Sequence, residues 1–85
     1  MHSKLDSAER FAGRIGREVL RERERLGMRQ DEVALAAGVS TRVIHQIEKG
    51  KATSRLDSVV PVLEVLGLTL QVERLGGQSD GGGEP

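Results

Sequence analysis

The chain has no cysteine, tryptophan or tyrosine, and Phe11 is its single aromatic residue. The lack of cysteine excludes disulfides, zinc fingers and thiol redox chemistry, and it fits an intracellular protein. The scarcity of aromatic side chains removes the platforms on which single-stranded nucleic acids and exposed RNA bases stack. No apolar run reaches the length of a signal peptide or a membrane span. We therefore expect a cytoplasmic protein with no membrane partner.

The formal net charge is zero, which at first argues against a nucleic-acid partner because such proteins are usually basic. The distribution of charge reverses that impression. Residues 1–55 carry twelve Lys and Arg against eight Asp and Glu, whereas residues 56–85 carry one Arg against five acids. We expect a basic face suited to double-stranded DNA and an acidic C-terminal part that meets a different partner.

The length of 85 residues allows one domain with a core of marginal size, which a second copy could enlarge. We interpret residues 1–12 as a flexible lead-in and residues 13–67 as the folded domain. Residues 68–74 are expected to form a dimerisation strand, and the Gly-rich residues 75–85 a disordered tail.

The first helix is expected from Ile15 to Leu26, where apolar residues recur at helical spacing up to a glycine that is a natural C-cap; an earlier start at Ser7 is the alternative. Gly13 and Gly16 lower the helix propensity at its start by roughly 1 kcal/mol each relative to alanine. The charged remainder of this helix is interpreted as a solvated face.

Two short helices should follow, over residues 30–37 and 41–48, separated by a turn at Gly38 and with Ser40 as the N-cap of the second. Small apolar residues supply the packing surface of the first, namely Val33, Leu35, Ala36 and Ala37. Val39, Ile44 and Ile47 point from the second toward the core. Its opposite face is polar and basic, which is how a helix-turn-helix presents side chains to the major groove of DNA.

A fourth helix is expected over residues 56–66, with Ser54 and Asp57 as a capping box. Its apolar residues repeat at spacings of three and four: Leu56, Val59, Val60, Leu63 and Leu66. Pro61 would cost about 3 kcal/mol inside a helix, so we expect a late start near Asp57 or a kink.

After Gly67 the pattern changes to a period of two, in which Leu68, Leu70 and Val72 alternate with polar residues. This alternation predicts a half-buried strand. One strand alone leaves its backbone hydrogen bonds unmade, and the nearest second strand is in another copy. We therefore expect a homodimer joined by a two-stranded sheet.

Residues 15–67 resemble the XRE/Cro-type helix-turn-helix family of phage repressors and bacterial regulators. The resemblance is carried by Arg23, Gln30, Leu35-Ala36, Gly38-Val39-Ser40, Ile44, Ile47-Glu48 and Gly50-Lys51. It implies an all-α, lambda-repressor-like domain, here with four main helices and a C-terminal β-strand where the family has a fifth helix. The segment 50–60 and the strand-like end look like those of HipB-type antitoxins, which build this strand into their dimer.

The start of the helix at Gln30 favours a phosphate, because free N–H groups and the helix dipole attract anions there. The resembling family similarly uses this glutamine as a clamp on the DNA backbone. Thr41, Arg42 and Gln46 are the candidate base readers, since Arg suits guanine and Gln suits adenine. Arg42 could equally contact a phosphate.

The other candidate DNA-binding residues are Ser40, His45, Lys49, Lys51 and Arg55. His45 either donates to a phosphate or lies at the rim of the interface. The two lysines and Arg55 either supply salt-sensitive affinity or are ordinary solvated charges. Arg23 and Glu48 lie on otherwise core-facing sides of their helices. The resemblance implies that they form a partly buried ion pair that fixes the recognition helix, so we assign them a structural role.

These features predict a dimeric repressor that reads a palindromic operator with half-sites about 34–36 Å apart. The HipB-type resemblance further implies an antitoxin that autoregulates its operon and neutralises a HipA-type kinase toxin through the acidic C-terminal half. The alternatives are a standalone XRE-type regulator and a protein-interaction module that uses the helix-turn-helix as a scaffold. No nucleophile with a paired base, carboxylate pair or ligand cluster is present, so we expect no enzymatic activity, no cofactor and no metal.

Overall fold

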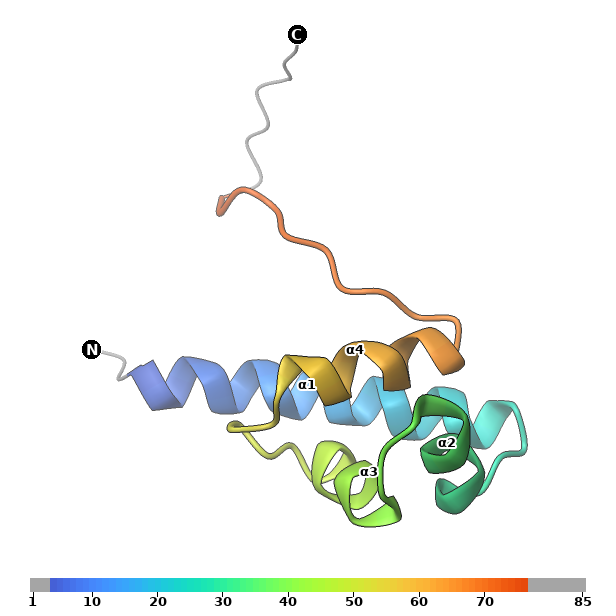
Figure 1. The fold of residues 1–85 in the computed structure, drawn as a ribbon. Coiled ribbons are helices and arrows are strands. Elements are labelled where there is room, and N and C mark those ends of the chain that lie inside the picture. The colour runs from blue at the N-terminus through green and yellow to red at the C-terminus, as the bar shows by residue number, and fades with distance from the viewer. Residues whose placement is uncertain (1–3, 77–85) are drawn as a thin grey trace, which may run out of the picture.

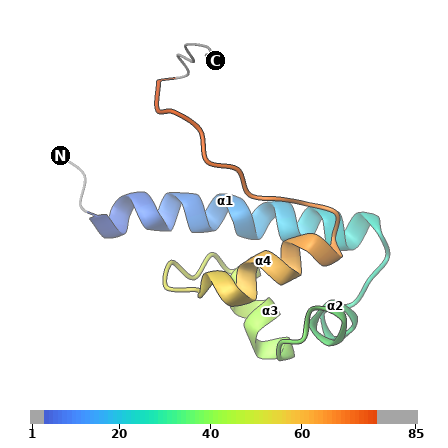
Figure 2. The same cartoon turned by 45° about the horizontal axis from the view of Figure 1, so that its top comes forward.

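The computed structural model describes residues 4–76, which fold into four helices and no strand. The helices are α1 (Lys4–Arg25), α2 (Gln30–Ala37), α3 (Thr41–Glu48) and α4 (Leu56–Val65). The long helix α1 runs along one edge of the molecule, and the three shorter helices lie on the same side of it (Figures 1 and 2). None of these helices has both the length and the apolar character needed to cross a membrane. The expected all-helical helix-turn-helix architecture is confirmed.

The hydrophobic core lies where the four helices meet, and each helix contributes to it. Its buried members are Val19, Val33, Ala34, Ile44, Ile47, Val59, Val62, Leu63 and Leu66. The helix α2 packs against both α3 and α4, while α1 packs against α3. The two helices of the helix-turn-helix are therefore held from behind by the two helices that flank them in the sequence.

The helix α1 begins at Lys4, which corrects the interpretation of residues 1–12 as a flexible lead-in; residues 1–3 lie outside the described part. Asp6 stands in the first turn, where the helix dipole favours an anion, and accepts a hydrogen bond of 3.0 Å from Arg10. The low helix propensity of Gly13 and Gly16 does not end the helix, in which Gly16 lies at a close contact with the end of α3 and Gly13 lies near Gly50, just after α3.

The helix α4 starts at Leu56, within one residue of the expected start near Asp57, and continues through Pro61. The expected capping box is absent. Ser54 donates its hydroxyl hydrogen to the carbonyl oxygen of Lys51 at 2.8 Å, and Arg55 is the N-cap residue. The burial of the apolar residues of α4 outweighs the helix hydrogen bond that proline cannot donate.

Leu35 does not supply packing surface as expected, because 84% of its surface is exposed. On α2 the core positions are Val33 and Ala34, with Ala37 packed against them. Leu35 and Ala36 point away from the core. All five residues at positions 33–37 are apolar, so the sequence pattern alone does not show which of them face the core.

Residues 68–74 form no strand within the described single chain. Leu68 and Leu70 are half-buried and pack against the core, whereas Val72 is fully exposed. The segment leaves α4 and extends away from the helices (Figure 1). The expected tail lies outside the described residues from position 77 onward.

Candidate nucleic-acid interface

The turn between α2 and α3 fixes where α3 begins. Gly38 has a φ of +76°, which glycine adopts without strain, and the backbone N–H of Val39 donates to the carbonyl of Ala34 at 3.0 Å. Ser40 then caps α3, because its hydroxyl oxygen accepts a hydrogen bond of 3.2 Å from the backbone N–H of Val43. Ser40, a candidate DNA-binding residue, is thus an exposed side chain that already serves as a helix cap.

The face of α3 that turns away from the core carries most of the predicted contact residues. The helix buries Ile44 and Ile47, which leaves the polar side chains on its outer side. Thr41, Arg42, His45 and Lys49 are exposed, and Gln46 is half-buried. Within the described residues none of these five side chains forms a hydrogen bond or an ion pair. The hydrogen-bonding groups of this face are therefore free to meet a ligand.

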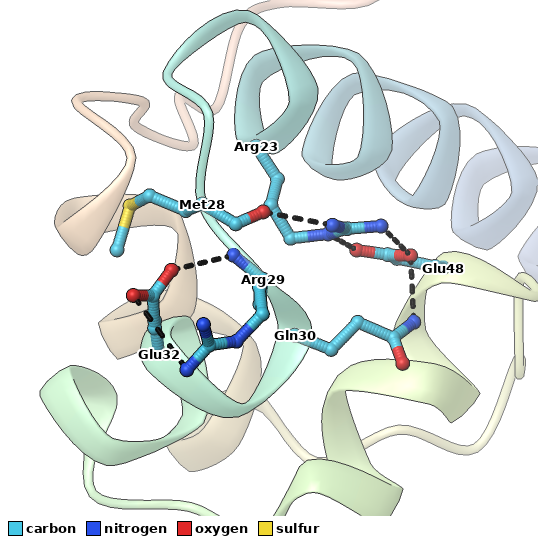
Figure 3. Close-up of polar contacts among 6 residues, drawn as sticks. All are labelled: Arg23, Met28, Arg29, Gln30, Glu32 and Glu48. Atoms are coloured by element: carbon cyan, nitrogen blue, oxygen red, sulfur yellow. Dashed lines mark hydrogen bonds and ion pairs between the residues drawn. The ribbon is translucent and has the colours of Figure 1, made fainter.

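An ion pair between Arg23 of α1 and Glu48 at the end of α3 lies behind this face (Figure 3). Arg23 donates from Nε to Glu48 Oε2 at 2.6 Å and from Nη2 to Oε1 at 3.1 Å. A third donation, from Nη1, reaches the carbonyl oxygen of Met28 at 2.9 Å. Only 14% of the Arg23 side chain and 7% of the Glu48 side chain are exposed. The hydrogen bond with Glu48 raises the pKa of Arg23 above its usual value, so the guanidinium is charged at any physiological pH.

Gln30, the predicted phosphate clamp, belongs to the same network. Its Nε2 donates to Glu48 Oε1 at 2.9 Å, and its side chain is half-buried (Figure 3). The first residue of α2 is thereby tied to the last residue of α3 across the helix-turn-helix. The sequence predicts separate roles for Gln30 and Glu48, because no local pattern indicates a contact between residues 18 positions apart.

The basic residues after α3 differ in how their charges are compensated. Lys49 and Lys51 are exposed and form no ion pair within the described part of the chain. Arg55 instead donates to both carboxylate oxygens of Asp57, at 2.9 and 2.8 Å. These hydrogen bonds lower the pKa of Asp57 below its usual range, so the carboxylate stays ionised and offsets the charge of Arg55.

Arg29, just before α2, is a charged residue near the candidate interface that the sequence analysis did not single out. Its backbone N–H donates to Glu32 Oε1 at 2.8 Å (Figure 3), and its guanidinium donates to Asp31 at 3.0 Å. The hydrogen bond from Arg29 lowers the pKa of Asp31. The spacing of Glu32 three residues after Arg29 is the signal that predicts such a cap.

Among residues 4–76 no group of three or more His, Asp or Glu side chains is placed to hold a metal ion.

Comparison with known proteins identifies the family to which the chain belongs. The helix-turn-helix family model matches residues 19–72, which include α2, the turn, α3 and α4. The chain is also 40% identical over 50 residues to a protein named HTH-type transcriptional regulator y4mF from Sinorhizobium fredii (strain NBRC 101917 / NGR234). That match covers 59% of this chain and 66% of the relative, slightly under two thirds of its length. The chain belongs to the XRE-type helix-turn-helix family.

Proposed function

We propose that this protein is a sequence-specific DNA-binding transcriptional repressor. The observation that carries the proposal is the outer face of α3, where Thr41, Arg42 and Gln46 have no partner among the described residues. An arginine and a glutamine on a short helix of this kind match the donor and acceptor patterns of guanine and adenine in the major groove. Family membership and the printed name of the relative support the same function.

Affinity for DNA would come from charges around α3 that carry no sequence information. Lys49 and Lys51 flank its end and are free to neutralise phosphates. At the start of α2, Gln30 would contact a phosphate through the amide hydrogen that it does not donate to Glu48, whereas the backbone N–H groups there already face the carboxylates of Asp31 and Glu32. His45 would sit at the rim of this contact.

The repressor would act as a homodimer on a palindromic operator. The alternation of Leu68, Leu70 and Val72 supports pairing of residues 68–74 from two copies into an antiparallel sheet. Such a sheet would set the separation of the two α3 helices at about 34–36 Å, one turn of DNA.

An antitoxin role is a narrower form of the same proposal. It is supported by the likeness of residues 50–60 to HipB-type antitoxins and by the acidic C-terminal part, which suits a basic protein partner such as a HipA-type kinase. In this role the protein would have no catalytic activity of its own. Binding to a co-purified kinase encoded beside the gene would support the role, and a lone gene without such a neighbour would favour a standalone regulator.

Alanine at Arg42 or Gln46 is expected to weaken binding to the duplex upstream of the protein's own gene by about 5- to 150-fold, since a bidentate base contact is worth about 1–3 kcal/mol. The melting temperature should not change, because both side chains lie outside the core. A mobility-shift titration at several salt concentrations measures the loss. The matched control is Arg17→Ala, which removes an exposed arginine of α1.

Equal losses on the upstream duplex and on a scrambled duplex would identify Arg42 as a phosphate contact rather than a base reader. If the parent protein shifts neither duplex even at low salt, the proposed function is wrong.

Replacing Asp57 with asparagine is expected to tighten DNA binding several-fold. The substitution removes the carboxylate that compensates Arg55 and frees this guanidinium for a phosphate. One additional phosphate contact should steepen the dependence of log K on log salt by about 0.9. The control is Glu64→Gln, which removes one acid from the exposed side of α4. An unchanged salt slope for Asp57→Asn would show that Arg55 lies away from the DNA.

A further inference from the structure

Phe11 of α1 stands between two hollows in the surface, and 56% of its own surface is exposed. The larger hollow has a volume of about 170 Å³ and lies between α1 and the segment after α4. Its walls include Phe11, Ile15, Glu18, Leu63, Leu68 and Leu70. The smaller hollow, of about 130 Å³, lies toward the start of α4. Cavities near 150 Å³ with apolar walls accept a group as large as benzene, so the larger hollow has room for a branched aliphatic side chain.

One wall of this hollow is formed by a segment whose apolar side chains and backbone N–H groups are only partly covered or paired within its own chain. We call residues 68–76 the C-terminal arm. Leu68 and Leu70 are half-buried and line the hollow, whereas Val72, on the same side of an extended chain, is fully exposed. No backbone N–H of residues 69–74 donates a hydrogen bond within the described chain. The arm thus offers both an unpaired strand edge and an uncovered apolar side chain.

We propose that the hollow beside Phe11 is the docking site for Val72 of a second copy of this chain. The inference deepens the proposed function, since it rests on pairing of the two arms in the homodimer. In an antiparallel pair with its two-fold axis at Leu70, Val72 of one copy lies directly opposite Leu68 of the other. Directly opposed residues have Cβ atoms about 4.5–5.5 Å apart and point to the same face. Because Leu68 lines the hollow, Val72 of the second copy is brought to the hollow beside it.

The edge of the hollow carries charges of both signs, and the arm carries a charge of its own. Arg74 follows Val72 on the same face of the arm and has no ion-pair partner within residues 4–76. Glu18 lines the hollow and is exposed, and its contact with Arg21 is long, at 3.5 Å. Arg14 also lines the hollow and is exposed, so an incoming Arg74 would meet both an acid and a base there, and the apolar walls rather than the charges favour Val72 as the occupant. The two-fold axis repeats the arrangement, so each copy fills the hollow of the other.

Sedimentation equilibrium of the full chain without DNA tests the proposal. The parent protein should be a dimer, and Val72→Asp should raise the dimer dissociation constant at least 100-fold. The far-ultraviolet circular dichroism of the variant should stay helical, because Val72 is fully exposed in the single chain. Phe11→Ala should also weaken the dimer, by at least tenfold. The matched control is Leu35→Asp, which changes an exposed apolar residue of α2 that lines neither hollow.

Cross-linking tests the register, because the parent chain contains no cysteine. Copies with Leu68→Cys mixed with copies with Val72→Cys should form a disulfide-linked pair under mild oxidation. Leu68→Cys mixed with Gln71→Cys should form far less, since position 71 faces the other side of the arm.

The outcomes separate this proposal from the proposed function. A monomeric parent protein, or a dimer unaffected by Val72→Asp and Phe11→Ala, would overturn the docking site, whatever the protein does with DNA. A dimer that depends on both residues but binds no duplex would support the docking site and overturn the function as a DNA-binding repressor.

Discussion

Replacing Arg23 with alanine is expected to lower the melting temperature by about 12–24 °C. The substitution removes two of the three hydrogen bonds that Glu48 accepts and leaves its carboxylate, 7% exposed, with only the amide of Gln30. Breaking one side of a buried pair costs about 3–5 kcal/mol, and the lower value applies here because Gln30 remains. Each kcal/mol corresponds to about 4–8 °C in a domain of this size. Thermal unfolding followed by circular dichroism measures the shift.

Arg25→Ala is the matched control for this prediction. Arg25 lies on the same helix and donates to Glu22 at 2.7 Å, a distance close to that between Arg23 and Glu48. However, 67% of the Arg25 side chain is exposed, and exposed pairs contribute about 0–1 kcal/mol. A similar fall in melting temperature for Arg23→Ala and Arg25→Ala would contradict the structural role of the buried pair.

The position of Glu48 connects this pair to the proposed function as well as to stability. Glu48 is the last residue of α3, and through it α3 is joined to α1 by Arg23 and to the start of α2 by Gln30. Helix α3 therefore has its outer face free and its C-terminal end fixed to two other helices. A side chain that reads a base must be held in a constant orientation, and this network supplies that constraint.

The bounds of α2 and α3 could be predicted to the residue, because local chemistry sets them. Gly38 adopts the positive φ that ends α2, and Ser40 supplies the hydroxyl that caps α3. The outer face of α3 followed from the burial of Ile44 and Ile47 on the opposite side. In each case the signal lies within about four residues of the feature, which is the range over which sequence patterns act.

The features that the sequence did not reveal depend on contacts between distant residues. Gln30 meets Glu48 only after the helix-turn-helix has closed. Asp57 was interpreted as part of a cap, but it is the partner of Arg55. The early start of α1 was the less favoured alternative because Gly16 was judged by its helix propensity, whereas in the folded chain it permits a close approach of two helices.

Gly16→Ala is expected to destabilise the fold by about 2 kcal/mol and to displace α3. A β-carbon at this buried position would lie 2.4 Å from the carbonyl oxygen of Ile47 and 2.8 Å from that of Glu48. Both obstacles are backbone atoms at the end of α3, so they cannot move aside without moving the helix. Overpacking a protein interior costs about 1–3 kcal/mol, and the two backbone contacts put this site at or above the upper value. The higher helix propensity of alanine offsets about 1 kcal/mol of that cost. Chemical denaturation measures the change in the free energy of unfolding.

Gly13→Ala, one turn earlier on α1, provides the contrasting control. Its β-carbon would meet only the Nη1 atom of Arg17, at 3.5 Å, an ordinary contact with a flexible side chain. Alanine at position 13 should therefore stabilise the protein by up to about 1 kcal/mol through helix propensity alone. Opposite signs for these two substitutions would show that contact with α3 requires glycine at position 16. If Gly16→Ala stabilised the protein as well, α1 and the end of α3 would have to lie farther apart than this structure places them.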